Sequence, residues 1–150
     1  MIHVPETFSI ALHTLAILAG EPGVYQSGKR IAENCQFSAN HLSKVVPLLV
    51  RAGLLEARRG PSRGVCFTLD PKEVTLEMIR RAVEGRVAPR KGCLLPHEVC
   101  PGKRCVLGCF LSKMEAEFQR VFKSTTLADI LRYVQKRKGN NYVKVHLLPM

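Results

Sequence analysis

The chain has 150 residues, which is enough for one compact domain with an appended element, and its hydrophobic content of 46% excludes a disordered protein. It carries 23 Lys and Arg against 12 Asp and Glu, a formal net charge of +11. This charge favours a polyanionic partner such as nucleic acid, and the alternative is a merely basic surface. The sequence shows neither a signal peptide nor an apolar run near the roughly 20 residues that cross a bilayer. We therefore expect a cytoplasmic protein without a membrane partner.

The first predicted element is a helix over residues 5–19. Apolar residues recur there at helical spacing, with Pro5 in the first turn and Gly20 just beyond the end. After a turn-rich connection, Ser27 can cap a short second helix that ends near Cys35.

A third helix follows after only a few residues, which is the arrangement of a helix-turn-helix. Ser38 can cap this helix and Gly53 closes it. Pro47 lies inside it and should kink or weaken it locally, because proline lacks a backbone N–H. The pattern predicts the helix but leaves its exact length open.

Residues 54–70 predict a β-hairpin, in which a Gly-Pro-Ser-Arg-Gly turn separates two short strands. A hairpin placed directly after a helix-turn-helix is a wing. Its tip has no core to bury, and its basic residues are placed to reach phosphates or a minor groove. The alternative is a solvated basic turn. The basic residues of the wing are Arg58, Arg59 and Arg63.

A fourth helix is expected after Thr75, which can cap it, with Glu77 in its first turn. Near the C-terminus, apolar residues recur at helical spacing over 111–122, and Thr126 with Asp129 can cap a last helix. Because the compact domain is expected to be complete by about residue 85, these late helices are predicted to cover a second copy of the chain in a two-fold dimer.

The expected organisation has four parts. They are a winged helix-turn-helix domain over 1–85, a cysteine-rich loop over 86–110, dimerisation helices over 111–138 and a loosely ordered tail over 139–150. The fold class is therefore mainly α with a small β-hairpin wing, a winged helix-turn-helix followed by a long C-terminal dimerisation helix.

Four of the six cysteines lie in one basic loop, which packing alone does not require. Such clusters form disulfides or hold a soft metal, and a cytoplasmic protein disfavours disulfides. The spacing lacks the paired CxxC knuckles of most zinc sites, which supports an iron–sulfur cluster over zinc only weakly. The loop cysteines are Cys93, Cys100, Cys105 and Cys109. The other two, Cys35 and Cys66, are interpreted as structural.

The phrases ALHTLAILA, KRIAENCQFSANHLSKVVPLLVRAGLLEARRGPSRGVCFTL, VTLEMIRRAVEG and FKSTTLADIL resemble the Rrf2 family of bacterial winged-helix regulators over nearly the whole chain. Family members with a cluster carry three cysteines between the fourth helix and the long helix, and Cys93, Cys100 and Cys105 match them. The resemblance implies an iron–sulfur cluster, 2Fe-2S or 4Fe-4S. The first gap is slightly longer than in the family, and Cys109 is extra.

The fourth ligand stays open. Cys109 lies one helical turn after Cys105, so both thiols can point the same way if the helix has begun. The resemblance implies instead a first-helix residue of the partner subunit; the acidic family position matches Ser9, a poor ligand, and His13 matches a position where histidine serves. A lone helix histidine is more often a packed residue. His97, inside the loop, is a weaker candidate.

We therefore expect a homodimeric transcription regulator that reads an inverted-repeat operator in double-stranded DNA, with affinity controlled by the cysteine loop. One alternative is a small cluster-carrying electron-transfer or assembly protein without specific DNA binding, and another is a regulator that senses zinc or thiols. No nucleophile–base pair or phosphate-binding glycine loop indicates an enzyme. The predicted DNA contacts are Ser27, Lys29, Ser38, Asn40, His41, Lys44, Arg58, Arg59 and Arg63.

Overall fold

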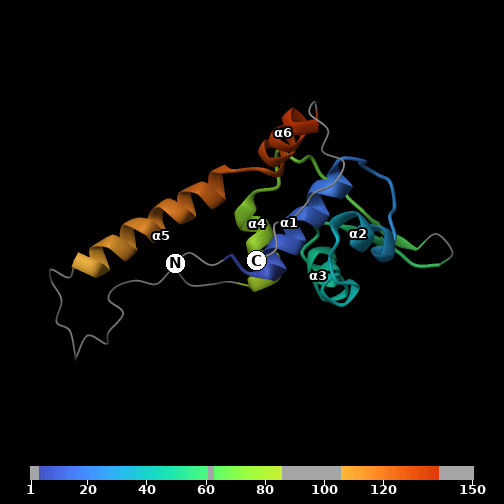
Figure 1. Ribbon diagram of the computed structural model, residues 1–150, viewed down its shortest axis with the longest axis horizontal. Helices are drawn as coiled ribbons and strands as arrows, with labels where there is room; N and C mark the ends of the chain where they lie inside the picture. Colours follow the sequence, from blue (N-terminus) through green and yellow to red (C-terminus); the bar gives the residue numbers. More distant parts are fainter. Residues whose placement is uncertain (1–3, 61–62, 86–105, 139–150) are drawn as a thin grey trace.

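The computed structural model describes residues 4–60, 63–85 and 106–138. Figure 1 shows a cluster of helices with a small hairpin at one end and a long helix that leaves the cluster at the other. This architecture confirms the predicted fold class. The elements are α1 (Glu6–Ala19), α2 (Gly28–Cys35), α3 (Ala39–Arg51), β1 (Glu56–Arg58), β2 (Gly64–Cys66), α4 (Leu76–Glu84), α5 (Val106–Ser124) and α6 (Leu127–Lys138).

The hydrophobic core is built around α1, which contacts α2, α3, α4 and α6. Leu15 and Leu18 of α1 are fully buried, and so are apolar residues from each of the neighbouring helices. Burying a side chain of this size contributes about 1.5–3 kcal/mol to the hydrophobic driving force. The largest members from the other elements are Ile31, Leu42, Leu49, Phe67, Ile79 and Leu127.

Side-chain caps fix the starts of three helices, α2, α4 and α6. The Ser27 hydroxyl accepts a hydrogen bond from the Arg30 amide at 3.3 Å, and the Thr75 hydroxyl accepts one from the Met78 amide at 3.3 Å. Ser38 differs from the expectation, because its side chain makes no capping hydrogen bond. Only the Ser38 carbonyl takes part, as the acceptor for the Leu42 amide at 3.0 Å.

The turn between α2 and α3 depends on one residue in the left-handed region. Gln36 has φ 56°, and the following Phe37 amide donates back to the Ala32 carbonyl at 3.1 Å. This closes α2 and lets α3 begin three residues later. The helix α3 then runs without interruption through Pro47 to Arg51, so the proline does not end it.

The wing is a two-stranded hairpin to which one residue before α2 adds an isolated bridge. The strands β1 and β2 pair antiparallel, with Glu56 opposite Cys66 and Arg58 opposite Gly64. On the other side of β2, Gln26 and Val65 exchange two backbone hydrogen bonds of 2.9 and 3.0 Å. The segment before α2 therefore forms an edge of the wing and ties it to the helical domain.

The two C-terminal helices behave differently from each other. The helix α5 extends away from the helical cluster (Figure 1), and its C-terminal end contacts the domain through Phe122, whose ring centroid lies 5.4 Å from that of Phe8. The helix α6 folds back onto the domain: the Leu127 amide donates to the Val74 carbonyl at 2.7 Å, and the Leu127 side chain is fully buried. From the sequence, the compact domain is expected to be complete by about residue 85. In the structure, the domain core also includes the start of α6.

The helices of the described residues are all too short or too polar to pass through a lipid bilayer.

Candidate nucleic-acid interface

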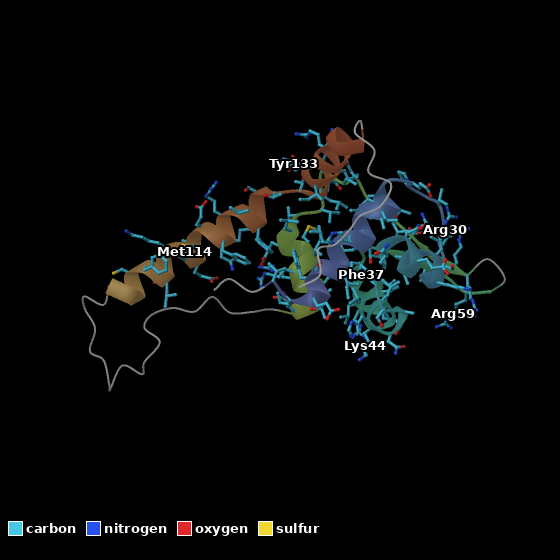
Figure 2. The ribbon with its side chains drawn as sticks, viewed as in Figure 1. Arg30, Phe37, Lys44, Arg59, Met114 and Tyr133 are labelled. Carbon is cyan, nitrogen blue, oxygen red and sulfur yellow. The ribbon has the colours of Figure 1, made fainter. Side chains whose placement is uncertain are left out.

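Three elements present basic and polar side chains at one end of the molecule. They are the N-terminal turn of α2, the N-terminal half of α3 and the wing. Figure 2 shows Arg30, Lys44 and Arg59 at this end, whereas Met114 lies on α5 at the opposite end. All nine predicted DNA-contacting residues are exposed. Their contact with DNA stays a prediction, and the structure supplies the surface on which it would occur.

The N-terminus of α2 offers backbone donors and positive charge together. The first amides of a helix point outward and attract anions, and the Ser27 hydroxyl already accepts one of them. Lys29 is highly exposed and makes only a loose pair with Glu33, with a nitrogen–oxygen distance of 4.0 Å. Arg30 is also exposed beside it. Arg30 is not among the DNA contacts predicted from the sequence, although its position next to Lys29 in the first turn of a helix indicates the same role.

The exposed side of α3 carries Asn40, His41 and Lys44. Asn40 and Lys44 are one helical turn apart and therefore lie on the same face. His41 differs from them because its Nδ1 atom lies 2.9 Å from a carboxylate oxygen of Glu6, in α1. A base contact through Nδ1 of His41 would have to displace this carboxylate, whose position no pattern in the sequence predicts.

A groove of about 910 Å³ lies between α2, α3 and the wing. Its floor contains apolar residues such as Phe37, Leu42 and Val65, while Lys29 and Arg63 lie among its polar lining residues. The groove brings α2 and the wing, which are far apart in the sequence, to the two sides of one depression. The predicted contacts of α2 and the wing are thus parts of one surface.

Tyr25, which precedes α2, joins the wing through several contacts that the sequence analysis missed. Its hydroxyl donates to Oε2 of Glu56 at 3.1 Å, and the guanidinium carbon of Arg58 lies 4.1 Å from the centre of its ring. The pKa of Tyr25 is raised to about 12 by a hydrogen bond with the Cys66 side chain, by burial and by the bond to Glu56. A phenol is protonated at neutral pH even at its ordinary pKa of about 10, so the hydroxyl is a donor there.

The predicted metal site falls mostly outside the described residues. Cys93, Cys100, Cys105 and His97 lie in the segment 86–105, which the structure does not describe. Cys109 is exposed in the first turns of α5. Within the described ranges, no group of three or more His, Cys, Asp or Glu residues is arranged to hold a metal ion. The ligand set stays a prediction.

His13, the other candidate for the fourth ligand, is half-buried on α1 and lies against Phe37 in the turn before α3. Its Nδ1 atom lies 2.7 Å from the Ser9 carbonyl oxygen, and its ring meets the Phe37 ring edge to face at 5.8 Å. Because a carbonyl only accepts, Nδ1 carries a proton and Nε2 keeps the free lone pair that a metal would need. The chemistry therefore fits a ligand. The position beside the helix-turn-helix is also that of an ordinary packed histidine.

Cys35 and Cys66 are both buried, with 4% and 0% of their surface exposed. Burial raises the pKa of the Cys35 thiol to about 11, so this residue stays a neutral thiol at physiological pH. Neutral buried thiols are poor nucleophiles and poor metal ligands. These surroundings agree with the structural role expected from the sequence.

With the fold and the surface described, comparison with known proteins identifies the family. The family model for Rrf2, described as an iron-dependent transcriptional regulator, matches residues 4–133. The chain belongs to the Rrf2 family. Its relatives are transcriptional regulators and not enzymes, which confirms the expectation that it has no catalytic function.

Relatives of the Rrf2 family match different shares of the chain. NsrR of Geobacillus kaustophilus is 34% identical over 110 residues, which are 69% of this chain and 71% of the relative. BadM of Rhodopseudomonas palustris, named as an HTH-type transcriptional regulator, is 45% identical over 65 residues, which are 43% of this chain and 42% of BadM. The chain thus spans less than half the length of BadM in that match.

Among solved structures, CymR, the global cysteine regulator of B. subtilis, superposes with a TM-score of 0.72 at 26% identity. The superposition covers 89% of this chain and 98% of CymR. The likeness therefore includes the C-terminal helices as well as the winged domain, and it confirms the fold.

Proposed function

We propose that this Rrf2 protein is a homodimeric, DNA-binding transcription regulator whose affinity for an inverted-repeat operator is controlled by an iron–sulfur cluster bound at the cysteine loop. The observation that carries the DNA-binding part is the single surface formed by α2, α3 and the wing. It combines a helix N-terminus, exposed basic side chains and a groove, on a chain with a net charge of +11.

In this proposal, α3 enters the major groove and its neighbours hold the DNA backbone. Asn40 and Lys44 would face base edges, because they share the exposed face of α3. The α2 N-terminus with Lys29 and Arg30 would bind phosphate, since helix amides and cations act there together. The arginines of the wing would follow the adjacent backbone or minor groove.

The dimer is proposed to form through the projecting part of α5. Phe110 has 56% of its surface exposed, and Met114 and Val121 are also exposed large apolar residues. Isolated exposed apolar residues are ordinary, but several of them on one projecting helix are typical of an interface. Two copies joined along α5 would place two reading surfaces on one duplex, as paired half-sites require.

The cluster is proposed to be held by Cys93, Cys100 and Cys105, with Cys109 or His13 of the partner subunit as the fourth ligand. The family description as iron-dependent supports this choice of metal. Thiolates are the usual ligands of iron–sulfur clusters, and Cys109 is exposed in the helix that follows the loop. A bound cluster would supply an iron- and redox-responsive centre next to the N-terminal end of α5.

The protein's own part in the control would be mechanical. In the sequence the cysteine loop is followed directly by α5, and the C-terminal end of α5 packs on α1 through Phe122 and Phe8. A change in the loop would therefore alter how α5 meets its partner and change the distance between the two DNA-reading surfaces.

A zinc- or thiol-sensing regulator is the second candidate. It is favoured by the structural likeness to CymR, which is described as a global cysteine regulator, and by the thiolate chemistry that zinc shares with iron–sulfur clusters. A cluster-carrying electron-transfer or assembly protein agrees less well, because it leaves the basic wing and the helix-turn-helix without a role.

The first experiment is a visible absorption spectrum of protein purified without oxygen, with iron, sulfide and zinc assayed on the same sample. The proposal expects a brown protein with matched iron and sulfide, both lost in Cys93→Ala, Cys100→Ala and Cys105→Ala. Cys109→Ala and His13→Ala then identify the fourth ligand. Zinc without sulfide, or no metal after reconstitution, would contradict the cluster and favour zinc or thiol sensing.

Operator binding is tested with DNA selected from a random duplex library by the wild-type protein. The proposal expects an inverted repeat whose affinity differs between the protein with and without its cluster. An affinity that is the same in both states would contradict control by the loop, while leaving DNA binding intact.

A further inference from the structure

Tyr25 crosses the wing from one edge to the other. Its neighbour Gln26 pairs with Val65, so the strand order in the wing is the segment at Gln26, then β2, then β1. The Tyr25 side chain contacts Cys66 in β2 and then Glu56 and Arg58 in β1. One side chain from the connection before α2 therefore reaches both strands of the hairpin.

The hydroxyl end of Tyr25 is anchored to β1 through Glu56. Oε2 of Glu56 accepts from the Tyr25 hydroxyl at 3.1 Å, and Oε1 accepts from the Thr68 hydroxyl at 3.2 Å. Both carboxylate oxygens thus have partners. Glu56 is held in place as the acceptor for the Tyr25 hydroxyl.

The ring of Tyr25 supports Arg58. The residue opposite Arg58 in the hairpin is Gly64, which has no side chain to pack against it. The guanidinium carbon instead lies 4.1 Å from the centre of the Tyr25 ring, within the range of a cation–π contact. The Tyr25 ring is therefore a surface on which the Arg58 side chain packs.

Stacking leaves the hydrogen-bonding capacity of Arg58 unused. A guanidinium stacks through its flat face, while its N–H donors lie in its plane and point outward. Among the described residues, no carboxylate or carbonyl is paired with the Arg58 side chain. A side chain that is fixed in direction and still has free donors is suited to a phosphate oxygen.

We propose that Tyr25 is a positioning residue for DNA binding: it holds Arg58 over its ring so that the guanidinium is presented, already ordered, to the DNA backbone beside the wing. This inference rests on the DNA-binding function proposed above. Because Arg58 is already ordered by the ring, it loses less side-chain entropy when it binds DNA. Tyr25 makes this contribution without a DNA contact of its own.

The test is a double-mutant cycle between Tyr25→Leu and Arg58→Ala. Leucine removes the ring but keeps apolar cover over Cys66, and Tyr25→Phe keeps the ring but removes the hydroxyl. Arg59→Ala is the matched control, because Arg59 is an exposed wing arginine without a contact to Tyr25. Affinity is measured by fluorescence anisotropy on a duplex selected by the wild-type protein, at several salt concentrations, with the thermal midpoint of each variant recorded.

We expect Tyr25→Leu to weaken DNA binding roughly three- to tenfold and Tyr25→Phe to bind nearly as well as wild type. Tyr25→Leu should add little to Arg58→Ala but retain its full effect in the Arg59→Ala background. Arg58→Ala should lower the slope of affinity against salt by about one, and Tyr25→Leu should lower it in the same direction.

Two results would overturn the inference. The first is a Tyr25→Leu effect of equal size with and without Arg58, which would indicate that Tyr25 acts only on the stability of the wing. The second is equal weakening by Tyr25→Phe and Tyr25→Leu, which would give the role to the hydroxyl. If the wild-type protein selects and binds no duplex, the DNA-binding function itself fails, and the inference fails with it.

Discussion

Gly64 occupies a position in the wing where no side chain fits. A Cβ atom there would lie 2.7 Å from the carbonyl oxygen of Gln26 and 2.9 Å from its carbonyl carbon. Both are backbone atoms, and the Gln26 segment is held by two hydrogen bonds to Val65. Neither side of this contact can move without breaking the edge of the sheet.

Gly64→Ala is therefore expected to lower the free energy of unfolding by about 1–3 kcal/mol, because it forces two backbone segments apart. Chemical denaturation followed by circular dichroism measures this change. Gly28→Ala is the matched control: nothing lies within 4 Å of its Cβ position, and alanine favours a helix. Equal stability of Gly64→Ala and wild type would contradict the steric explanation.

At the residue scale, the sequence predicts those interactions that are short in range. The sequence predicts the Ser27, Thr75 and Thr126 caps, because each capping residue lies only three positions from the amide that it caps. The contacts Tyr25–Arg58 and His41–Glu6 join residues more than 30 positions apart. No periodicity or propensity records such a pairing, since it depends on how the elements pack.

At the scale of single elements, α4 contains a buried ion pair that the sequence presents as an ordinary first-turn acid. Glu77 and Arg80 each expose only 6% of their surface. The Arg80 Nε atom donates to Glu77 at 2.8 Å, and the exposed Arg81 donates to the same carboxylate at 2.7 Å. The hydrogen bond from Arg80 is the main cause that lowers the pKa of Glu77.

Glu77→Gln is expected to lower the free energy of unfolding by roughly 3 kcal/mol, because it leaves the buried Arg80 charge with only the more distant Glu84 carboxylate, at 3.7 Å, as a counter-charge. The wild-type advantage should be complete at neutral pH. It should be lost as the pH falls through the lowered pKa of Glu77, where the carboxylate becomes neutral. Denaturation curves at several pH values measure both effects.

The control for Glu77→Gln is Glu117→Gln in α5. Glu117 pairs with Arg120 on the solvent-exposed surface. Exposed pairs contribute little to stability, so this variant should unfold nearly as wild type does. A similar loss for both variants would show that burial is not what gives the Glu77 pair its importance.

The helix α6 shows why the packing of an amphipathic helix is harder to predict than its existence. The capping box of Thr126 and Asp129 was read from the sequence, and the structure confirms it: the Thr126 amide donates to Asp129 at 3.0 Å, and the Asp129 amide donates to Thr126 at 3.3 Å. The sequence does not predict the surface against which the apolar face of α6 packs. An apolar stripe predicts that a helix face is buried, but it does not predict which surface covers that face. In this protein Leu127 of α6 is buried in the core of its own chain.

At the scale of the whole molecule, the apolar surface of α5 is the feature without a partner inside the described chain. Phe110→Asp and Met114→Asp are expected to turn a dimer into a monomer, because a buried charge opposes an apolar interface. Size-exclusion chromatography with light scattering measures the mass. Lys113→Gln, on the same exposed part of α5, is the control and should stay dimeric.

Thermal unfolding distinguishes a lost interface from a lost fold, since the winged domain has its own core. A monomeric wild-type protein would contradict the proposed interface, and so would a Phe110→Asp protein that remains dimeric. Loss of the dimer should also weaken binding to a complete inverted repeat more than binding to a half-site, because each subunit then binds alone.

The attachment of α5 also gives the molecule the geometry of a lever. Its C-terminal end is fixed, since Phe122 packs on Phe8 and the next residues are hydrogen-bonded to the start of α4. The helix begins at Val106, 16 residues before Phe122, so its N-terminal end lies about 24 Å from this ring contact. A tilt of about 5° would move that end by roughly 2 Å, at constant helix length. A small rotation at a ring contact is thereby converted into a displacement of atomic size at the point where the cysteine segment joins.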